Sequence, residues 1–138
     1  MSVSPYVNFN GNCREAVEFY ARVFGTAAPR IMTFGEAPPN PAFTIDDSTK
    51  KLIMHAEIDL MGTPLMFSDV PPGMNFVVGN NISITVQSKS KEELTRWFGA
   101  IKQGGKVVME LGPQSWSKLY GFVHDKFAVG WQFNFVEG

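Results

Sequence analysis

Two amphipathic helices, each preceded by one strand and followed by three, most constrain the fold of this chain. The first predicted helix covers Cys13–Phe24 and the second covers residues 91–103. Apolar side chains recur in both at helical spacing, so each helix has one face to bury. The apolar positions are Ala16, Val17, Tyr20, Val23 and Phe24 in the first helix and Leu94, Trp97, Phe98 and Ile101 in the second. The repeated order predicts two βαβββ modules.

Capping residues indicate where both helices begin and end. Asn12 precedes the first helix and Glu15 stands three residues later, which is the pattern of a capping box. Ser90 and Glu93 repeat this pattern before the second helix. Gly25 supplies a stop for the first helix, because glycine readily adopts the left-handed conformation of a helix end. We therefore predict Asn12 and Ser90 as the N-caps.

Segments of alternating polar and apolar residues surround each helix. This alternation, bounded by glycine, proline and asparagine, is typical of half-buried strands. In the first half of the chain it predicts strands at residues 6–10, 30–34, 52–60 and 64–68. In the second half it predicts strands at residues 81–86, 107–111, 118–124 and 131–136.

The two halves align as an internal repeat. Placing Gly62 opposite Gly130 sets Met66 opposite Asn134, and these residues are 68 positions apart, about half the chain. The alignment rests on element order and capping more than on identical residues. It predicts that Met66 and Asn134 occupy equivalent positions in the two modules.

The chain divides into two modules within one predicted structural domain. The first module covers residues 1–70, a linker covers 71–80, and the second module covers 81–138. The linker contains two prolines and a glycine, which favour turns over regular structure. Three prolines likewise predict a mobile loop over residues 35–47.

One face of the predicted strands is apolar and the opposite face is unusually polar. If a helix covers the apolar face of each sheet, the polar face is left either to solvent or to a cleft shared by the two modules. Both interpretations stay open from alternation alone. The polar face contains Asn8, His55, Glu57, Ser68, Asn81, Ser83, Gln132 and Asn134, with Met66 added by the repeat alignment and Ile53 by its phase.

Composition excludes several classes of function. The formal net charge of −1 provides no basic surface for nucleic acid, so we expect no nucleic-acid partner. No apolar run approaches the ~20 residues of a membrane span, and residues 1–5 lack the features of a signal peptide. Cys13 is the single cysteine and has no partner for an internal disulfide. We expect a cytoplasmic protein that does not bind a membrane.

Four segments together resemble one known family. They are YVNFNGNCREAVEFY at residues 6–20, IMHAEI at 53–58, FSD at 67–69 and DKFAVGW at 125–131. As a set they are similar to the PhnB-like family of the vicinal oxygen chelate superfamily, which includes glyoxalases, bleomycin-resistance proteins and extradiol dioxygenases. The resemblance covers nearly the whole chain. It implies an α+β fold in which paired βαβββ modules form a curved mixed sheet with an internal cleft, and it implies a homodimer.

The resemblance also implies where a metal would bind. The superfamily's metalloenzymes use His, Glu or Gln at four positions, which fall here near residues 5–8 and at Met66, Asn81 and Asn134. A thioether and two carboxamides are weak ligands for the divalent ions of this superfamily. We therefore predict no metal site and no cofactor, and at most a weakly bound divalent ion.

His55 and Glu57 are the best candidates for catalysis. Two residues apart on a strand, their side chains leave the same face with Cβ atoms ~7 Å apart, close enough to share a proton, a water or an ion. The alternative is a structural pair satisfied by neighbouring polar groups or by solvent. The predicted ligand pocket around them consists of Asn8, Met66, Ser68, Asn81, Trp116, Tyr120, Gln132 and Asn134.

Three other features suggest weaker hypotheses. Trp116 and Tyr120 suit an aromatic wall for a planar ligand, and equally suit core packing or a dimer interface. Asp69 is more typical of a turn before proline than of an acid catalyst. Cys13 lies at a helix N-terminus beside Arg14, conditions that lower the pKa of a thiol, although no partner base is identifiable.

The sequence favours a small-molecule pocket protein on a vicinal oxygen chelate scaffold without assigning its ligand, and it leaves open whether the protein is an enzyme. One alternative is a lyase-like or isomerase-like enzyme in which His55 and Glu57 act as acid and base. Another is a protein that sequesters its ligand, as bleomycin-resistance proteins do. Family members are often labelled demethylubiquinone methyltransferases, but the sequence lacks the glycine-rich loop and following acidic residue typical of an S-adenosylmethionine site.

Overall fold

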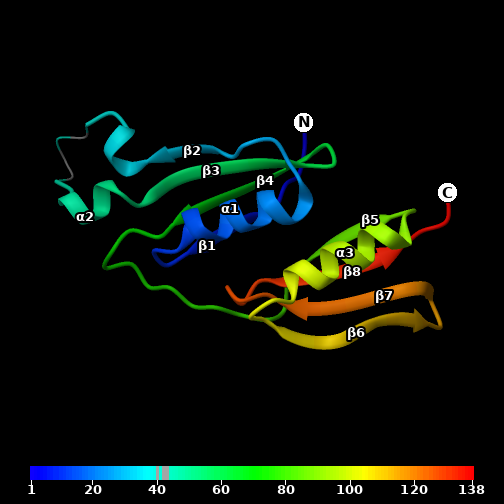
Figure 1. Ribbon diagram of the computed structural model, residues 1–138. Helices are drawn as coiled ribbons and strands as arrows, with labels where there is room; N and C mark the ends of the chain where they lie inside the picture. The colour runs from blue at the N-terminus through cyan, green and yellow to red at the C-terminus, as the bar shows by residue number, and fades with distance from the viewer. Residues whose placement is uncertain (40, 42–43) are drawn as a thin grey trace. The chain divides into compact units, whose positions relative to one another are not determined.

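The computed structural model describes residues 1–39, 41 and 44–138, which form two compact units, residues 1–76 and 77–138. The first unit contains β1 (Tyr6–Phe9), α1 (Cys13–Phe24), β2 (Arg30–Thr33), a short 3-10 helix (Phe34–Glu36), α2 (Asp47–Lys50), β3 (Ile53–Leu60) and β4 (Thr63–Asp69) (Figure 1). The second contains β5 (Ser83–Ser88), α3 (Lys91–Ile101), β6 (Lys106–Gln114), β7 (Ser117–His124) and β8 (Gly130–Phe135).

Each unit has one four-stranded mixed sheet, and the two sheets share one topology. The strand order is β1-β4-β3-β2 in the first unit and β5-β8-β7-β6 in the second. The β1·β4 and β5·β8 pairs are parallel, and the remaining neighbours are antiparallel. The prediction of an α+β fold with two βαβββ modules is confirmed.

Helix α1 covers one face of the first sheet and forms the core of the first unit (Figure 1). Its boundaries, Cys13–Phe24, are those that the apolar stripe and Gly25 predict. The ring of Tyr20 packs 5.8 Å from that of Phe67 on β4, measured between centroids. Burying each large apolar side chain contributes roughly 1.5–3 kcal/mol, so this face fixes the helix on the sheet. No helix of the described residues packs on the opposite face of the sheet.

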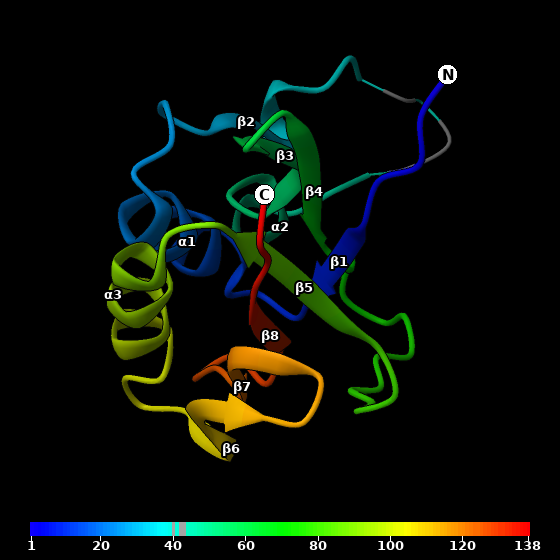
Figure 2. The same ribbon diagram turned by 90° about the vertical axis from the view of Figure 1, so that its right-hand side faces the viewer.

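Helix α3 packs on the second sheet in the same way (Figure 2). The ring of Phe98 meets Phe133 of β8 edge to face at 5.9 Å. Gly121 lies beneath this contact, where a Cβ atom would stand 2.8 Å from Phe98 Cε2 and 3.1 Å from Leu111 Cα. The close approach of the helix to β7 therefore requires glycine at this position.

The two helices are capped by different means. Ser90 caps α3 as predicted, because its hydroxyl accepts the backbone N–H of Glu93. The predicted cap of α1 is wrong, since the Asn12 side chain makes no capping hydrogen bond within the described chain. Asp69, at the end of β4, accepts the N–H groups of Gly11 and Cys13 instead. The parallel β1·β4 pairing places the end of β4 beside the start of α1.

Several predicted boundaries differ from the structure. Strand β5 begins at Ser83, so Asn81 lies before the strand and is exposed. Helix α3 ends at Ile101, short of the predicted residue 103. Ile53 is buried rather than on the polar face, because the β2·β3 register shifts at the adjoining end of β2.

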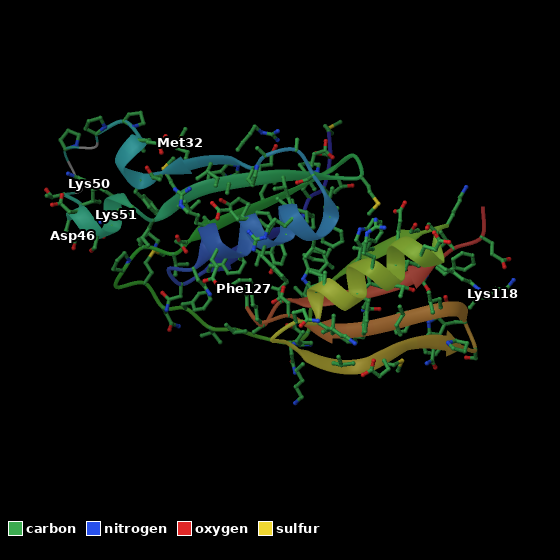
Figure 3. All side chains as sticks on the ribbon, viewed as in Figure 1. Met32, Asp46, Lys50, Lys51, Lys118 and Phe127 are labelled. Carbon is green, nitrogen blue, oxygen red and sulfur yellow. The ribbon has the colours of Figure 1, made fainter. Side chains whose placement is uncertain are left out.

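The loop predicted over residues 35–47 is interrupted at both ends by short helices. The 3-10 helix Phe34–Glu36 occupies its start, and α2 begins at Asp47, next to Asp46, which is labelled in Figure 3. The Asp46 side chain accepts the backbone N–H of Thr49. Residues 40, 42 and 43 of this predicted loop lie outside the described residues.

The predicted equivalence of Met66 and Asn134 is wrong. Met66 pairs with Tyr6 at the start of β1, whereas Asn134 pairs with Gln87, next to the end of β5. The hairpins explain the difference, since β3 and β4 are joined by the tight turn at residues 61–62 and β7 and β8 by the longer turn at residues 125–129. Gly62 lies in the turn before β4, whereas Gly130 is the first residue of β8, so the two glycines are not equivalent.

Candidate functional site

The helix-free face of the first sheet brings most of the predicted first-module residues together. Strand pairing sets Tyr6, Met66, Glu57 and Arg30 in one row across β1, β4, β3 and β2. Asn8 pairs with Ser68, and His55 pairs with Met32, in the adjoining row. We call these eight residues the His55 face. Their role in binding or catalysis stays a prediction.

Both nitrogens of the His55 ring face a polar partner. The Tyr6 hydroxyl lies 3.1 Å from Nδ1, and the two ring centroids are 5.7 Å apart. On the other side of the ring, Nε2 lies 3.9 Å from Oε1 of Glu57. These two contacts fix the orientation of the ring. The His55 side chain is 40% exposed, so it is still open to a ligand.

Arg30 completes this network from β2. Its guanidinium pairs with Oε2 of Glu57, while Oε1 of the same carboxylate faces His55. The arginine side chain is largely exposed, so the ion pair contributes at most about 1 kcal/mol to stability. Its consequence is mainly geometric, because it orients the carboxylate that faces the imidazole.

The remaining residues of the His55 face are uncharged. Ser68 donates a hydrogen bond of 2.8 Å to Oδ1 of Asn8. The thioethers of Met66 and Met32 lie in the rows beside Glu57 and His55, and Met32 is labelled on β2 in Figure 3. This combination of polarizable sulfur and hydrogen-bonding groups suits a ligand that is partly apolar.

Sequence reasoning missed Tyr6 and Arg30. Tyr6 stands two residues before Asn8 and therefore shares its face, which was the available signal. Arg30 opens β2, and its pairing with Glu57 follows only once β2 is known to be the neighbour of β3. Neither contact is local in sequence.

The second unit carries a separate hydrogen-bonded chain on its helix-free face. Tyr120 donates from its hydroxyl to Oε1 of Gln132 at 2.6 Å, and Gln132 donates from Nε2 to Ser83 at 2.7 Å. The Trp116 ring meets Tyr120 at 5.3 Å between centroids and is 61% exposed. Burial raises the pKa of Tyr120 above its ordinary value.

The structure divides the predicted residues of the second module. Tyr120 pairs across the ladder with Asn134, so Trp116, Tyr120, Gln132 and Asn134 lie close together. Oδ1 of Asn134 is buried without a hydrogen-bond partner among the described residues. Asn81 does not belong to this group, because it is exposed ahead of β5.

The hypothesis of an activated Cys13 is wrong. The side chain is fully buried, and burial raises the pKa of the thiol to about 12, with the Asp69 carboxylate adding to the effect. Arg14 opposes the shift but has a smaller influence. The backbone N–H of Cys13 has no acceptor within α1 and donates to the Asp69 carboxylate instead. It is therefore not available to stabilise a thiolate.

The positions that correspond to the superfamily's metal ligands do not fit a tight divalent site. Met66 offers a thioether, Asn134 a carboxamide, and Asn81 lies off the sheet. Within the described ranges, no three His, Cys, Asp or Glu side chains are grouped to bind a metal ion.

Comparisons with known proteins cover nearly the whole chain. Residues 1–134 match the family described as 3-demethylubiquinone-9 3-methyltransferase. Protein YjdN of Escherichia coli K12 is 31% identical over 144 residues, covering 99% of this chain and 97% of that protein.

Solved structures show the same fold. Protein PA1353 from Pseudomonas aeruginosa is 34% identical with a TM-score of 0.88, covering 100% of this chain and 99% of that one. A putative 3-demethylubiquinone-9 3-methyltransferase, PhnB protein, from Bacillus cereus is 26% identical with a TM-score of 0.78, covering 99% and 100%. At 12% identity, the fosfomycin resistance protein FosX from Listeria monocytogenes shares the fold alone, with a TM-score of 0.61 over 97% of this chain and 91% of that chain.

Proposed function

The chain belongs to the 3-demethylubiquinone-9 3-methyltransferase family, the PhnB-like branch of the vicinal oxygen chelate superfamily, and we propose that it binds a small molecule on its His55 face. The observation that carries this proposal is the orientation of His55 between Tyr6 and Glu57 on an open sheet face. Ligand sites commonly combine an apolar lining with a few polar groups of fixed direction.

The arrangement of the His55 face supports binding over mere solvation. A solvated sheet face needs no defined contacts between its side chains. Here Tyr6 of β1 contacts the His55 imidazole, and Arg30 of β2 pairs with Glu57 of β3, the carboxylate that faces this imidazole. Ordering such side chains costs conformational entropy. A network that keeps His55 oriented and 40% exposed leaves a hydrogen-bonding group available to a ligand.

Proton transfer is the second candidate function. The Nε2 atom of His55 lies 3.9 Å from the Glu57 carboxylate, and histidine is the side chain that enzymes use most often as a general acid or base. In this case the bound molecule would be converted by a lyase-like or isomerase-like reaction. Binding and turnover use the same residues, so only the fate of the ligand separates the two functions.

Methyl transfer is not part of the proposal. Each sheet has one parallel strand pair, β1·β4 or β5·β8, and the remaining pairs are antiparallel. A typical S-adenosylmethionine site lies at the strand ends of a parallel α/β sheet. A family description identifies relatives and does not assign a reaction to the residues of this chain.

We also infer a cytoplasmic homodimer that works without a cofactor, apart from a weakly bound divalent ion at most. Apolar side chains at Val77, Val78 and Ile82 are exposed, with Ile82 at 82%, which favours a protein contact. No helix in the described part of the chain is long and apolar enough to cross a membrane.

An NMR fragment screen tests the binding proposal, with ligand signals detecting binding and the protein's histidine signals locating it. The library consists of planar polar fragments, and the protein is labelled with ¹⁵N at its two histidines, His55 and His124. We expect bound fragments to shift the His55 ring signals and to lose affinity at least tenfold in His55→Ala. The matched control is His124→Gln, which should retain binding.

Two outcomes of the screen would reject the proposal. One is that no fragment binds the wild-type protein, and the other is that fragments bind His55→Ala with unchanged affinity. Incubating each bound fragment with wild-type protein and recording its spectrum over hours then separates the candidate functions. Unchanged spectra support binding alone, and conversion that is lost in Glu57→Gln supports proton transfer.

A further inference from the structure

The surroundings of His55 determine which ring nitrogen carries the proton. Nε2 faces the Glu57 carboxylate, which only accepts hydrogen bonds, so the proton of a neutral imidazole is favoured on that side. Nδ1 then presents a lone pair to Tyr6 at 3.1 Å. In that tautomer the Tyr6 hydroxyl donates this hydrogen bond and His55 accepts it.

This direction makes Tyr6 the outer end of a chain of four side chains. Arg30 orients Glu57, Glu57 faces His55, and His55 accepts from Tyr6. Tyr6 is 46% exposed, so its oxygen can contact a ligand while its proton points toward the imidazole. His55 therefore acts on the ligand through Tyr6.

We propose that Tyr6 is the proton-exchanging residue of the His55 face, and that the ligand is a weak oxygen acid such as a phenol or an enol. The inference rests on the proposed function, which places a ligand on this face.

The proton transfer is balanced within the site. The ligand O–H bond breaks and its proton passes to the Tyr6 oxygen, while the Tyr6 proton passes to Nδ1 of His55. The products are a bound phenolate or enolate and an imidazolium beside the Glu57 carboxylate. No electrons leave or enter the site, and the reverse transfer restores the neutral ligand.

The charge of the face favours a neutral acid over a permanent anion. Arg30 and Glu57 neutralise each other, and these are the two fully charged side chains among the eight residues of the His55 face. A carboxylate or phosphate ligand would therefore meet no excess positive charge there. Met66 and Met32 provide apolar contacts that suit an aromatic ring or a conjugated enol.

The histidine tautomer is the first arm of the test, and it needs no ligand. Long-range ¹H–¹⁵N NMR above the pKa of the imidazole reports which nitrogen of His55 carries the proton. We expect the Nε2–H tautomer in the wild-type protein. A predominant Nδ1–H tautomer would overturn the inference, because the tyrosine would then be the acceptor.

The second arm uses 4-nitrophenol, whose phenolate absorbs visible light. We expect binding to wild-type protein to raise the phenolate-to-phenol ratio of the bound probe by about tenfold, equal to one pKa unit. Tyr6→Phe keeps the ring and should still bind the probe while losing this shift. His55→Gln should also lose it, and His124→Gln should leave it unchanged.

The two arms separate failure of the inference from failure of the proposed function. An equal shift in Tyr6→Phe, probe bound in its neutral form, or no binding of the probe overturns the inference. If planar fragments still bind and depend on His55 in the earlier screen, the proposed function stands without it. If no fragment binds, both are rejected, even when the tautomer is Nε2–H.

Discussion

The carboxylate of Asp69, the last residue of β4, accepts the backbone N–H of Cys13, the first residue of α1, at 3.0 Å. The same oxygen accepts from Gly11, and the second oxygen accepts from the N–H of Ile53 on β3 at 2.9 Å. One buried side chain thus satisfies donors from the loop before α1, the helix itself and a neighbouring strand. Buried donors of this kind are costly when left unpaired.

Asp69→Asn should lower the free energy of unfolding by about 2 kcal/mol or more. The amide keeps one acceptor oxygen and turns a donor group toward N–H groups that need an acceptor, so at least one buried hydrogen bond is lost. Urea denaturation measures the change. Asp47→Asn is the control, because Asp47 is exposed on α2 and should leave the midpoint unchanged. Equal midpoints for the two variants would contradict the structural role of Asp69.

The Cys13 thiol should be unreactive in the folded protein near pH 8. Its pKa of about 12 keeps it protonated where a solvent-exposed cysteine begins to ionise. Unfolded protein loses this proton at lower pH than folded protein does. The contribution of Cys13 to stability is therefore unchanged below the ordinary value of 9.0 and falls between that pH and about 12.

Thiol reagents and denaturation curves check this prediction. 5,5′-Dithiobis(2-nitrobenzoic acid) should react with unfolded protein at least a hundredfold faster than with native protein. In Cys13→Ala the decline of stability above pH 9 should be smaller, whatever the cost of the substitution itself. Rapid labelling of the native protein would show that Cys13 is not buried.

Helix positions and the polar sheet face are predictable from sequence because their signals are local. The α1 boundaries follow from an apolar stripe and from Gly25, which adopts the left-handed conformation at φ 62°. His55 and Glu57 share a face because they lie two residues apart on one strand. Patterns within a few residues were sufficient in both cases.

Contacts between distant strands were not predictable in this way. Tyr6 reaches His55 across 49 residues, and the contact depends on β4 lying between β1 and β3. Asp69 replaces Asn12 as the cap of α1 because β4 pairs parallel with β1. Alternation gives the face of a side chain but not which strand lies beside it.

Tyr120→Phe should lower the free energy of unfolding by about 1 kcal/mol. The substitution removes the hydrogen bond to Gln132, whose Oε1 loses its donor while the ring remains. Burial also raises the pKa of Tyr120, so this tyrosine should ionise at higher pH than a free one. Absorbance titration of wild type minus Tyr120→Phe isolates that step. A step at or below the ordinary value of 10.0 would contradict the burial of this hydroxyl.

The wild-type chain should sediment as a dimer at micromolar concentration. Exposed apolar residues at Val77, Val78 and Ile82 favour association, and a charged residue in such a contact is strongly unfavourable. Ile82→Lys is expected to shift sedimentation toward the monomer, whereas Lys106→Glu on β6 should not. A wild-type monomer under these conditions would reject the homodimer.

Two glycine substitutions should change stability in opposite directions. In Gly121→Ala the new methyl group would lie 2.8 Å from Phe98 and 3.1 Å from the Leu111 backbone, so α3 must move away from β7. Overpacking of this kind costs about 1–3 kcal/mol. Gly99→Ala on α3 meets no atom within 4 Å and should stabilise the helix by about 0.5–1 kcal/mol. Thermal unfolding of both variants compares them directly. A Gly121→Ala protein as stable as the wild type would mean that α3 does not pack on β7 as closely as the structure places it.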